Sequence, residues 1–141
     1  MTAAPAALAT PADVTAAADS LTAAADVLRK RLQKELARGL LTHEEAQRWN
    51  EQEALLRQNA NALYLDAAGL VLADVPLAQE RLLSVIDYGT QRIARLEKFT
   101  VILAIATDLA LIAGAIALRK VTPLLASVKK LKADSAAFAA R

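Results

Sequence analysis

The residues best suited to acid–base or metal chemistry occur together in the stretch His43-Glu44-Glu45. A zinc-binding HExxH helix needs a second histidine one turn later, and His43 is the only histidine in the sequence. The next carboxylates, Glu51 and Glu53, belong to the same expected helix. We therefore expect a solvated helix start here, with His43 as a residue of the first turn.

Other kinds of catalytic site have no candidate residues. The sequence contains no cysteine, which excludes disulfides, thiolate nucleophiles and zinc–cysteine sites. It lacks the glycine-rich phosphate-binding motifs of P-loop and dinucleotide-binding proteins. A net charge of +2 and an aromatic content of 4% give no sign of nucleic-acid binding. The sequence predicts a protein that is not an enzyme, with no cofactor, no metal and no small-molecule substrate.

Asp108 is the only charged residue in the apolar segment Phe99–Leu118. This segment has about the twenty residues that a helix needs to cross a bilayer. In lipid, Asp108 would be an intramembrane contact or a proton site, because an acid is costly to keep there. In a protein bundle it would be a buried, protonated carboxyl group held by hydrogen bonds. The sequence is compatible with both interpretations.

Two faces of this segment differ in the size of their side chains. The bulky face consists of Ile102, Ile105, Leu109, Ile112 and Ile116. The small or weakly polar face consists of Thr100, Ala104, Thr107, Asp108, Leu111, Gly114 and Ala115. In a membrane we expect the bulky face to contact lipid and the small face to pack against another helix. The alternative is a helix that protein encloses on nearly all sides.

The elements that position these groups are all expected to be helices. Hydrophobic residues make up 55% of the sequence, and only four glycines and four prolines interrupt it. Caps and prolines predict helices over residues 11–38, 43–73 and 74–120, and from 122 toward the C-terminus. The start signals are Thr10-Pro11, the capping box Thr42/Glu45, Asp74-Val75-Pro76 and Thr122-Pro123, and a weak point in the third helix is Tyr88-Gly89-Thr90.

The chain is therefore expected to be all-α, with four regions. Residues 1–10 form a disordered lead, 11–98 a coiled-coil or bundle region, 99–118 a membrane helix and 119–141 a basic amphipathic helix. At 1.5 Å per residue, the helix over 43–73 would be about 46 Å long, and the helix that follows the Asp74-Val75-Pro76 start signal and runs to residue 120 about 66 Å. The longer helix would overshoot its antiparallel neighbour by about 20 Å, and the overshoot would be the apolar segment.

Apolar residues recur along the first three helices at coiled-coil spacing. The expected seams are Val14, Ala18, Leu21, Ala25, Leu28 and Leu32, then Trp49, Leu56, Leu63 and Leu70, then Leu82, Ile86, Gly89, Ile93 and Leu96. Stripes of this kind belong more often to an ordinary bundle core than to a free leucine-zipper dimer, and the short connections between the helices favour antiparallel neighbours.

The last helix carries Lys129, Lys130 and Lys132 near the side opposite its apolar residues. A basic amphipathic helix that follows an apolar segment is typical of a membrane interface. The alternative is a C-terminal helix that folds back onto the long helix and covers its overshoot.

The junction from Leu118 to Leu124, with the sequence LRKVTPL, resembles the point where a transmembrane helix leads into a HAMP signalling module. In that family, a basic pair, a hydrophobic residue and Pro-Leu follow the apolar helix. The resemblance covers this junction and the first HAMP helix, and nothing in the sequence corresponds to the second HAMP helix. It implies a membrane helix at 99–118.

Three functions follow from these patterns. The first is a membrane-associated helical protein, in a bacterial inner membrane, that self-associates or binds a protein partner through helix packing. The second is a soluble all-α bundle that serves as a protein-binding subunit or adaptor. The third is a pore-forming component that shields its apolar segment before insertion. This alternative remains because a simple membrane-spanning chain would have to export the residues before the apolar segment, and residues 1–13 lack the basic region of a signal peptide.

Overall fold

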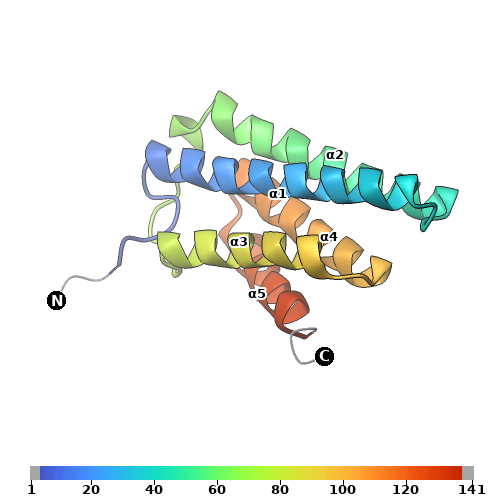
Figure 1. Ribbon diagram of the computed structural model, residues 1–141. Coiled ribbons are helices and arrows are strands. Elements are labelled where there is room, and N and C mark those ends of the chain that lie inside the picture. Colours follow the sequence, from blue (N-terminus) through green and yellow to red (C-terminus); the bar gives the residue numbers. More distant parts are fainter. Residues whose placement is uncertain (1–3, 138–141) are drawn as a thin grey trace.

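The computed structural model describes residues 4–137, and within them the chain is helical without a β-strand (Figure 1). The elements are α1 (Pro11–Ala37), α2 (His43–Leu65), the short 3-10 helix η1 (Ala68–Leu70), α3 (Gln79–Arg95), α4 (Phe99–Ala117) and α5 (Val121–Ala137). The predicted all-α class is confirmed for this part of the chain. The outermost residues of the expected lead and of the expected C-terminal helix, 1–3 and 138–141, lie outside the described residues.

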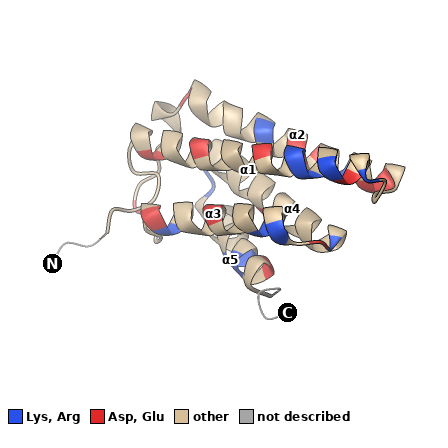
Figure 2. Cartoon of the chain, in the orientation of Figure 1, with Lys and Arg blue, Asp and Glu red and all other residues tan. Residues whose placement is uncertain are grey.

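The helices pack into a closed bundle. Around its circumference, α1 contacts α2 and α3, α2 contacts α4, and α5 contacts both α4 and α3. The antiparallel hairpin of α1 and α2 lies at the top of Figure 1, with α3 below it. α4 contacts each of the other four helices. The most apolar helix is therefore the central packing element of the fold, and Figure 2 shows its ribbon almost free of the colours that mark charged residues.

Local sequence signals set the ends of α1 and the start of α2. The hydroxyl of Thr10 accepts a hydrogen bond from the backbone N–H of Asp13, and Pro11 is the first residue of α1. Gly39 follows the helix with φ +67°, the left-handed conformation that glycine adopts without steric cost. Thr42 and Glu45 form the reciprocal hydrogen bonds of a capping box. These sequence predictions are confirmed.

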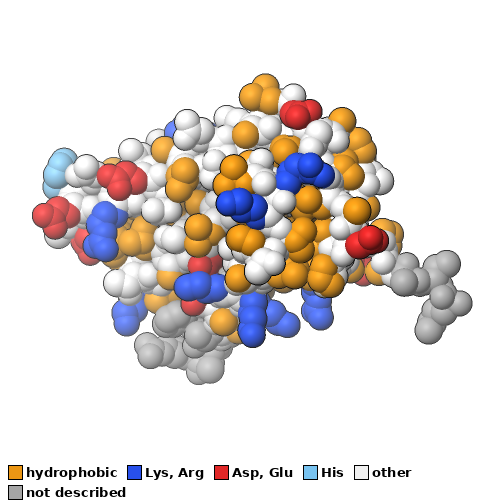
Figure 3. Space-filling view, turned by 180° about the vertical axis from the view of Figure 1, so that it is seen from behind, with side chains coloured by type: hydrophobic (Ala, Val, Ile, Leu, Met, Phe, Trp, Pro, Cys, Tyr) orange, Lys and Arg blue, Asp and Glu red, His pale blue; other side chains and the backbone are white. Residues whose placement is uncertain are grey.

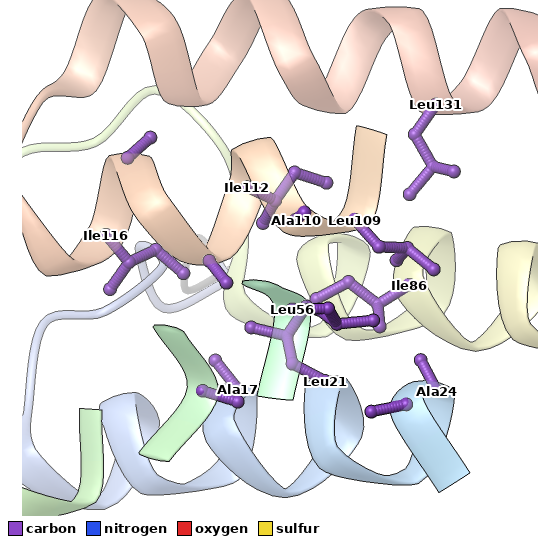
Figure 4. Close-up of a cluster of buried hydrophobic side chains, with 14 of the residues drawn as sticks. Ala17, Leu21, Ala24, Leu56, Ile86, Leu109, Ala110, Ile112, Ile116 and Leu131 are labelled. Atoms are coloured by element: carbon purple, nitrogen blue, oxygen red, sulfur yellow. The ribbon is translucent and has the colours of Figure 1, made fainter. Parts of the chain in front are cut away.

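The core consists of the predicted seams together with the bulky face of α4. Nearly all seam residues are buried, and Leu96 is partly buried. Figure 4 shows side chains of α1, α2, α3, α4 and α5 converging in this core, with Leu21, Leu56, Ile86, Leu109 and Leu131 among those labelled. The seams therefore pack together in one bundle core, which is the arrangement predicted in preference to a free leucine-zipper dimer.

The expected single helix over residues 74–120 is wrong. The chain leaves helical geometry at Leu96–Lys98, between α3 and α4, and reverses direction there (Figure 1). No proline or glycine marks this break. Instead, the guanidinium of Arg31 donates to the carbonyl oxygens of Ile93 and Ala94, at 2.9 and 3.2 Å, and so caps the end of α3 from another helix. The break removes the expected overshoot.

Gly89 lies inside α3, and the weak point expected around it does not interrupt the helix. A Cβ atom at this position would lie 2.9 Å from Cδ1 of Leu131 in α5. The glycine therefore allows α5 to approach α3 closely.

α2 ends at Leu65, earlier than the expected Ala73. The Asp66 side chain accepts a hydrogen bond from the backbone N–H of Gly69 at 3.2 Å, and this local turn replaces further helix. The start of α5 differs slightly as well, because Val121 precedes the expected Thr122-Pro123 start and Pro123 lies in the first turn.

The lead is ordered from Pro5 onward, contrary to the disorder expected for residues 1–10. Ala7 and Leu8 are fully buried. The Ala7 N–H donates to the carbonyl oxygen of Leu77 at 2.7 Å, and the Leu8 N–H donates to the side chain of Gln79 at 2.9 Å. Burial of two apolar side chains and these long-range hydrogen bonds offset the entropy of ordering an Ala- and Pro-rich segment.

Candidate functional site

The bulky face of α4 lies inside the bundle. The side chains of Ile105, Leu109, Ile112 and Ile116 are fully buried, and Ile102 is nearly so. In this fold the residues expected to contact lipid contact protein instead. α4 remains long and apolar enough to cross a membrane, with a mean hydropathy of 2.2, but 61% of that stretch is buried within the protein.

Most of the small face of α4 reaches the surface, although Asp108 and Ala115 are buried. Thr100 and Leu111 are exposed, and Leu103, Ala104, Thr107 and Gly114 are partly buried. Except for Gly114, these side chains form the floor of a groove of about 350 Å³, which runs from Phe99 to Leu111 between Arg48 of α2 and Lys130 of α5. Figure 3 views the molecule from behind, and hydrophobic side chains gather over the middle of that face.

Asp108 lines this groove and is fully buried. Its Oδ1 lies 3.4 Å from the ammonium nitrogen of Lys130, which in turn lies 2.6 Å from Oδ2 of Asp134. Among the described residues, neither carboxylate oxygen of Asp108 accepts a hydrogen bond. α4 itself supplies no charged partner for Asp108. The partners Lys130 and Asp134 come from α5, where they lie one turn apart.

The protonation states of this group follow from burial and neighbouring charge. The pKa of Asp108 is raised to about 8, mainly by burial and then by the nearby Asp134 carboxylate, while Lys130 opposes the shift. A protonated Asp108 can donate to Asp134, which lowers the pKa of Asp134. Near neutral pH the arrangement is a neutral acid, a carboxylate and an ammonium ion.

The lysines of α5 stay on the outside while its apolar side packs inward. Leu124 and Leu131 are fully buried and Val128 is nearly so, against α4 and α3. Lys129, Lys130 and Lys132 are exposed. Of the two alternatives for this helix, the structure shows the one in which it folds back onto the bundle.

The acidic residues near the start of α2 differ in their surroundings. His43 and Glu44 are exposed in the first turn, as expected. Glu53, expected to be solvated, is 2% exposed and accepts a hydrogen bond from Arg57 at 2.8 Å. Arg29 of α1 lies 3.3 Å from the same carboxylate, so Glu53 joins the two helices of the hairpin. The described residues hold no cluster of three potential metal ligands.

Two features of the site were missed by the sequence analysis. Asp134 lies four residues after Lys130, so the sequence could have predicted an i,i+4 ion pair on the helix. The approach of Asp134 to Asp108, however, depends on how α5 packs. The groove itself depends on which face of α4 the other helices leave open. No protein-family model, curated protein or solved structure matches the chain.

Proposed function

We propose that this chain is a non-enzymatic helical-bundle protein that acts by pairing with a second copy of itself through the open small face of α4. The observation that carries the proposal is the symmetry of that face. The surface positions Thr100, Leu103, Thr107, Leu111 and Gly114 are spaced evenly on either side of Thr107.

This spacing suits a two-fold axis. When two α4 helices cross antiparallel at Thr107, Thr100 lies opposite Gly114 of the other copy, and Leu103 lies opposite Leu111. A two-fold interface requires this kind of self-complementarity. Threonine at the centre allows the helices to approach closely, and Leu111, 51% exposed, supplies the apolar area, whereas the Asn59 side chain of α2 lies against Gly114.

The interface is small. Arg48 and Lys130 bound the groove on its two sides. Stable protein interfaces bury about 1,200–2,000 Å² in total. A single helix face with two flanking helices falls toward the lower end of that range, where complexes are transient. We therefore expect a reversible dimer, detected better by cross-linking than by size.

Disulfide trapping tests the pairing cleanly, because the sequence has no cysteine of its own. Under mild oxidation, Thr107→Cys should form a disulfide-linked dimer. A mixture of Thr100→Cys and Gly114→Cys should form mixed dimers in preference to either variant alone, because the helices run antiparallel. Leu65→Cys, at an 88% exposed position off the groove, is the control for random collision.

Two results would contradict the proposal. If Thr107→Cys forms no more dimer than Leu65→Cys, the face does not meet its own copy. If Thr100→Cys alone forms dimers faster than the mixture, the helices pair in parallel and the two-fold geometry is wrong.

A second candidate is membrane association, favoured by the length and hydropathy of α4. The protein would then be located in a membrane, and the sequence analysis above expects a bacterial inner membrane. In that case the bundle is a shielded form, because insertion would require the bulky face of α4 to leave the core. The exposed lysines of α5 would suit an anionic lipid surface. Carbonate extraction of a membrane fraction tests this candidate, since a soluble bundle is released into the supernatant.

A further inference from the structure

A second cavity lies at the end of the bundle where α1 ends, α2 begins and α3 gives way to α4. Its volume is about 420 Å³. Small-molecule sites span about 300–1,000 Å³, so the cavity has the capacity for a small organic ligand. None of its wall belongs to the dimer face of α4 described above, apart from Phe99 at the start of that helix.

The inner wall of the cavity is apolar and aromatic. Trp49 and Ile102 are each 1% exposed, and Phe99 and Leu41 are partly buried beside them. The indole N–H of Trp49 donates to the carbonyl oxygen of Leu28 at 3.1 Å, which fixes the ring. The centroids of the Trp49 and Phe99 rings are 6.1 Å apart, with their planes at 42°. This wall offers a rigid surface to a flat or apolar body.

One side of the cavity is already neutralised. Arg31 Nε lies 2.9 Å from a carboxylate oxygen of Glu35, and both side chains are nearly buried. The other donors of Arg31 cap the end of α3. This pair is therefore part of the wall and not a free charge.

The rim of the cavity is positive. Lys34, Arg38 and Arg95 line it, and within residues 4–137 none of them forms an ion pair. Glu97 is the single acid at the rim. Three cations against one carboxylate give the opening a net positive charge directly above an apolar wall. Guanidinium groups bind carboxylate and phosphate oxygens with paired hydrogen bonds.

We propose that this cavity binds a small organic anion, with an aromatic or apolar body against Trp49 and Phe99 and a phosphate or carboxylate group at Lys34, Arg38 and Arg95. The inference is independent of the α4 dimer, because it rests on different residues. The same anionic chemistry occurs in free metabolite-sized molecules and in lipid headgroups. The cavity size favours the free molecule, since a lipid would need room for its chains.

Trp49 provides the measurement, because it is the only tryptophan in the sequence and lies in the wall. Phenyl phosphate should change the Trp49 fluorescence saturably and with a dependence on salt concentration. Phenol, which lacks the charge, and inorganic phosphate, which lacks the apolar body, should each bind at least about tenfold more weakly. Vesicles of phosphatidylglycerol, compared with phosphatidylcholine vesicles, test the lipid source.

The double variant Arg38→Gln/Arg95→Gln should weaken phenyl phosphate binding about tenfold or more, because it removes two charged partners. Arg81→Gln, at a basic position outside this cavity, is the matched control and should bind as wild type does. Circular dichroism of both variants confirms that the fold is kept.

Three outcomes would overturn the proposal: no saturable response to phenyl phosphate, equal binding by the double variant and by Arg81→Gln, or a response to phosphatidylglycerol vesicles alone. The disulfide trapping of α4 is unaffected by any of them, so failure here is distinguishable from failure of the dimer.

Discussion

Replacing Leu109 with arginine is expected to abolish the folded bundle. The Leu109 side chain is fully buried in the core shown in Figure 4, where an arginine has no acidic partner on its own side of α4. An unpaired buried charge and the lost apolar contacts together cost about 4 kcal/mol or more, a large part of the stability of a small domain. Circular dichroism should show lost helix or a strongly lowered Tm.

Leu111→Arg is the matched control for this prediction. The two positions are two residues apart on α4, but Leu111 is 51% exposed in the groove. We expect Leu111→Arg to fold with a change within about 0.5 kcal/mol, as surface substitutions usually do. It should also weaken the Thr107→Cys dimer, because it places like charges at the proposed interface.

The pair of variants separates the bundle from a membrane-spanning helix. In a bilayer both positions lie within the apolar segment, so either arginine would impair insertion. Equal damage by Leu109→Arg and Leu111→Arg would therefore contradict the bundle as the working form of the protein.

Asp108→Asn is expected to stabilise the protein at neutral and alkaline pH. The folded chain holds the pKa of Asp108 at about 8, against 3.8 for an ordinary aspartate. Between these values the unfolded chain has lost the proton and the folded chain retains it, so wild-type stability falls as pH rises from about 4 to 8. Asparagine carries no such proton in either state and removes this loss.

The stabilisation should be close to zero near pH 4 and reach on the order of 2–4 kcal/mol at pH 8. Asparagine keeps only part of the contacts that Asp108 makes with Lys130 and Asp134. The loss of the other part reduces the stabilisation of the variant. The lowered pKa of Asp134 acts in the opposite sense, as stability lost when pH falls below about 4, outside this window.

Denaturant unfolding of wild type and Asp108→Asn across pH 4–8 measures the effect. Asp108→Leu is the companion variant, because it also removes the buried polar oxygen atoms and should be at least as stable. A difference that is constant with pH, or a less stable asparagine variant at pH 7, would mean that Asp108 is ionised in the fold and that Lys130 is its essential partner.

The sequence predicted several helix ends correctly from local signals. The caps at Thr10 and Thr42 and the glycine at Gly39 mark ends that the structure reproduces. Helix periodicity identified the buried faces, because side chains three and four residues apart must share a face. These features depend only on residues within one or two turns of each other.

The sequence could not predict features that depend on contacts between distant segments. The end of α3 is set by Arg31, more than sixty residues earlier in the chain, and no local residue announces it. The ordering of Ala7 and Leu8 depends on partners in the loop before α3. The sequence separated a bulky from a small face of α4, but which of them the bundle would cover follows from the packing of α2 and α5.

The N-terminal lead has a consequence for the order of folding during synthesis. Chains emerge from the ribosome N-terminus first, at about 5–20 residues per second. The hydrogen bond from Leu8 to Gln79 spans a sequence separation of 71 residues, so the Leu8 N–H has no partner until the start of α3 has been made. The α1–α2 hairpin can form first from its own local signals. Ala7 and Leu8 therefore leave the ribosome early, but they reach their final place only after both helices of the α1–α2 hairpin have been made.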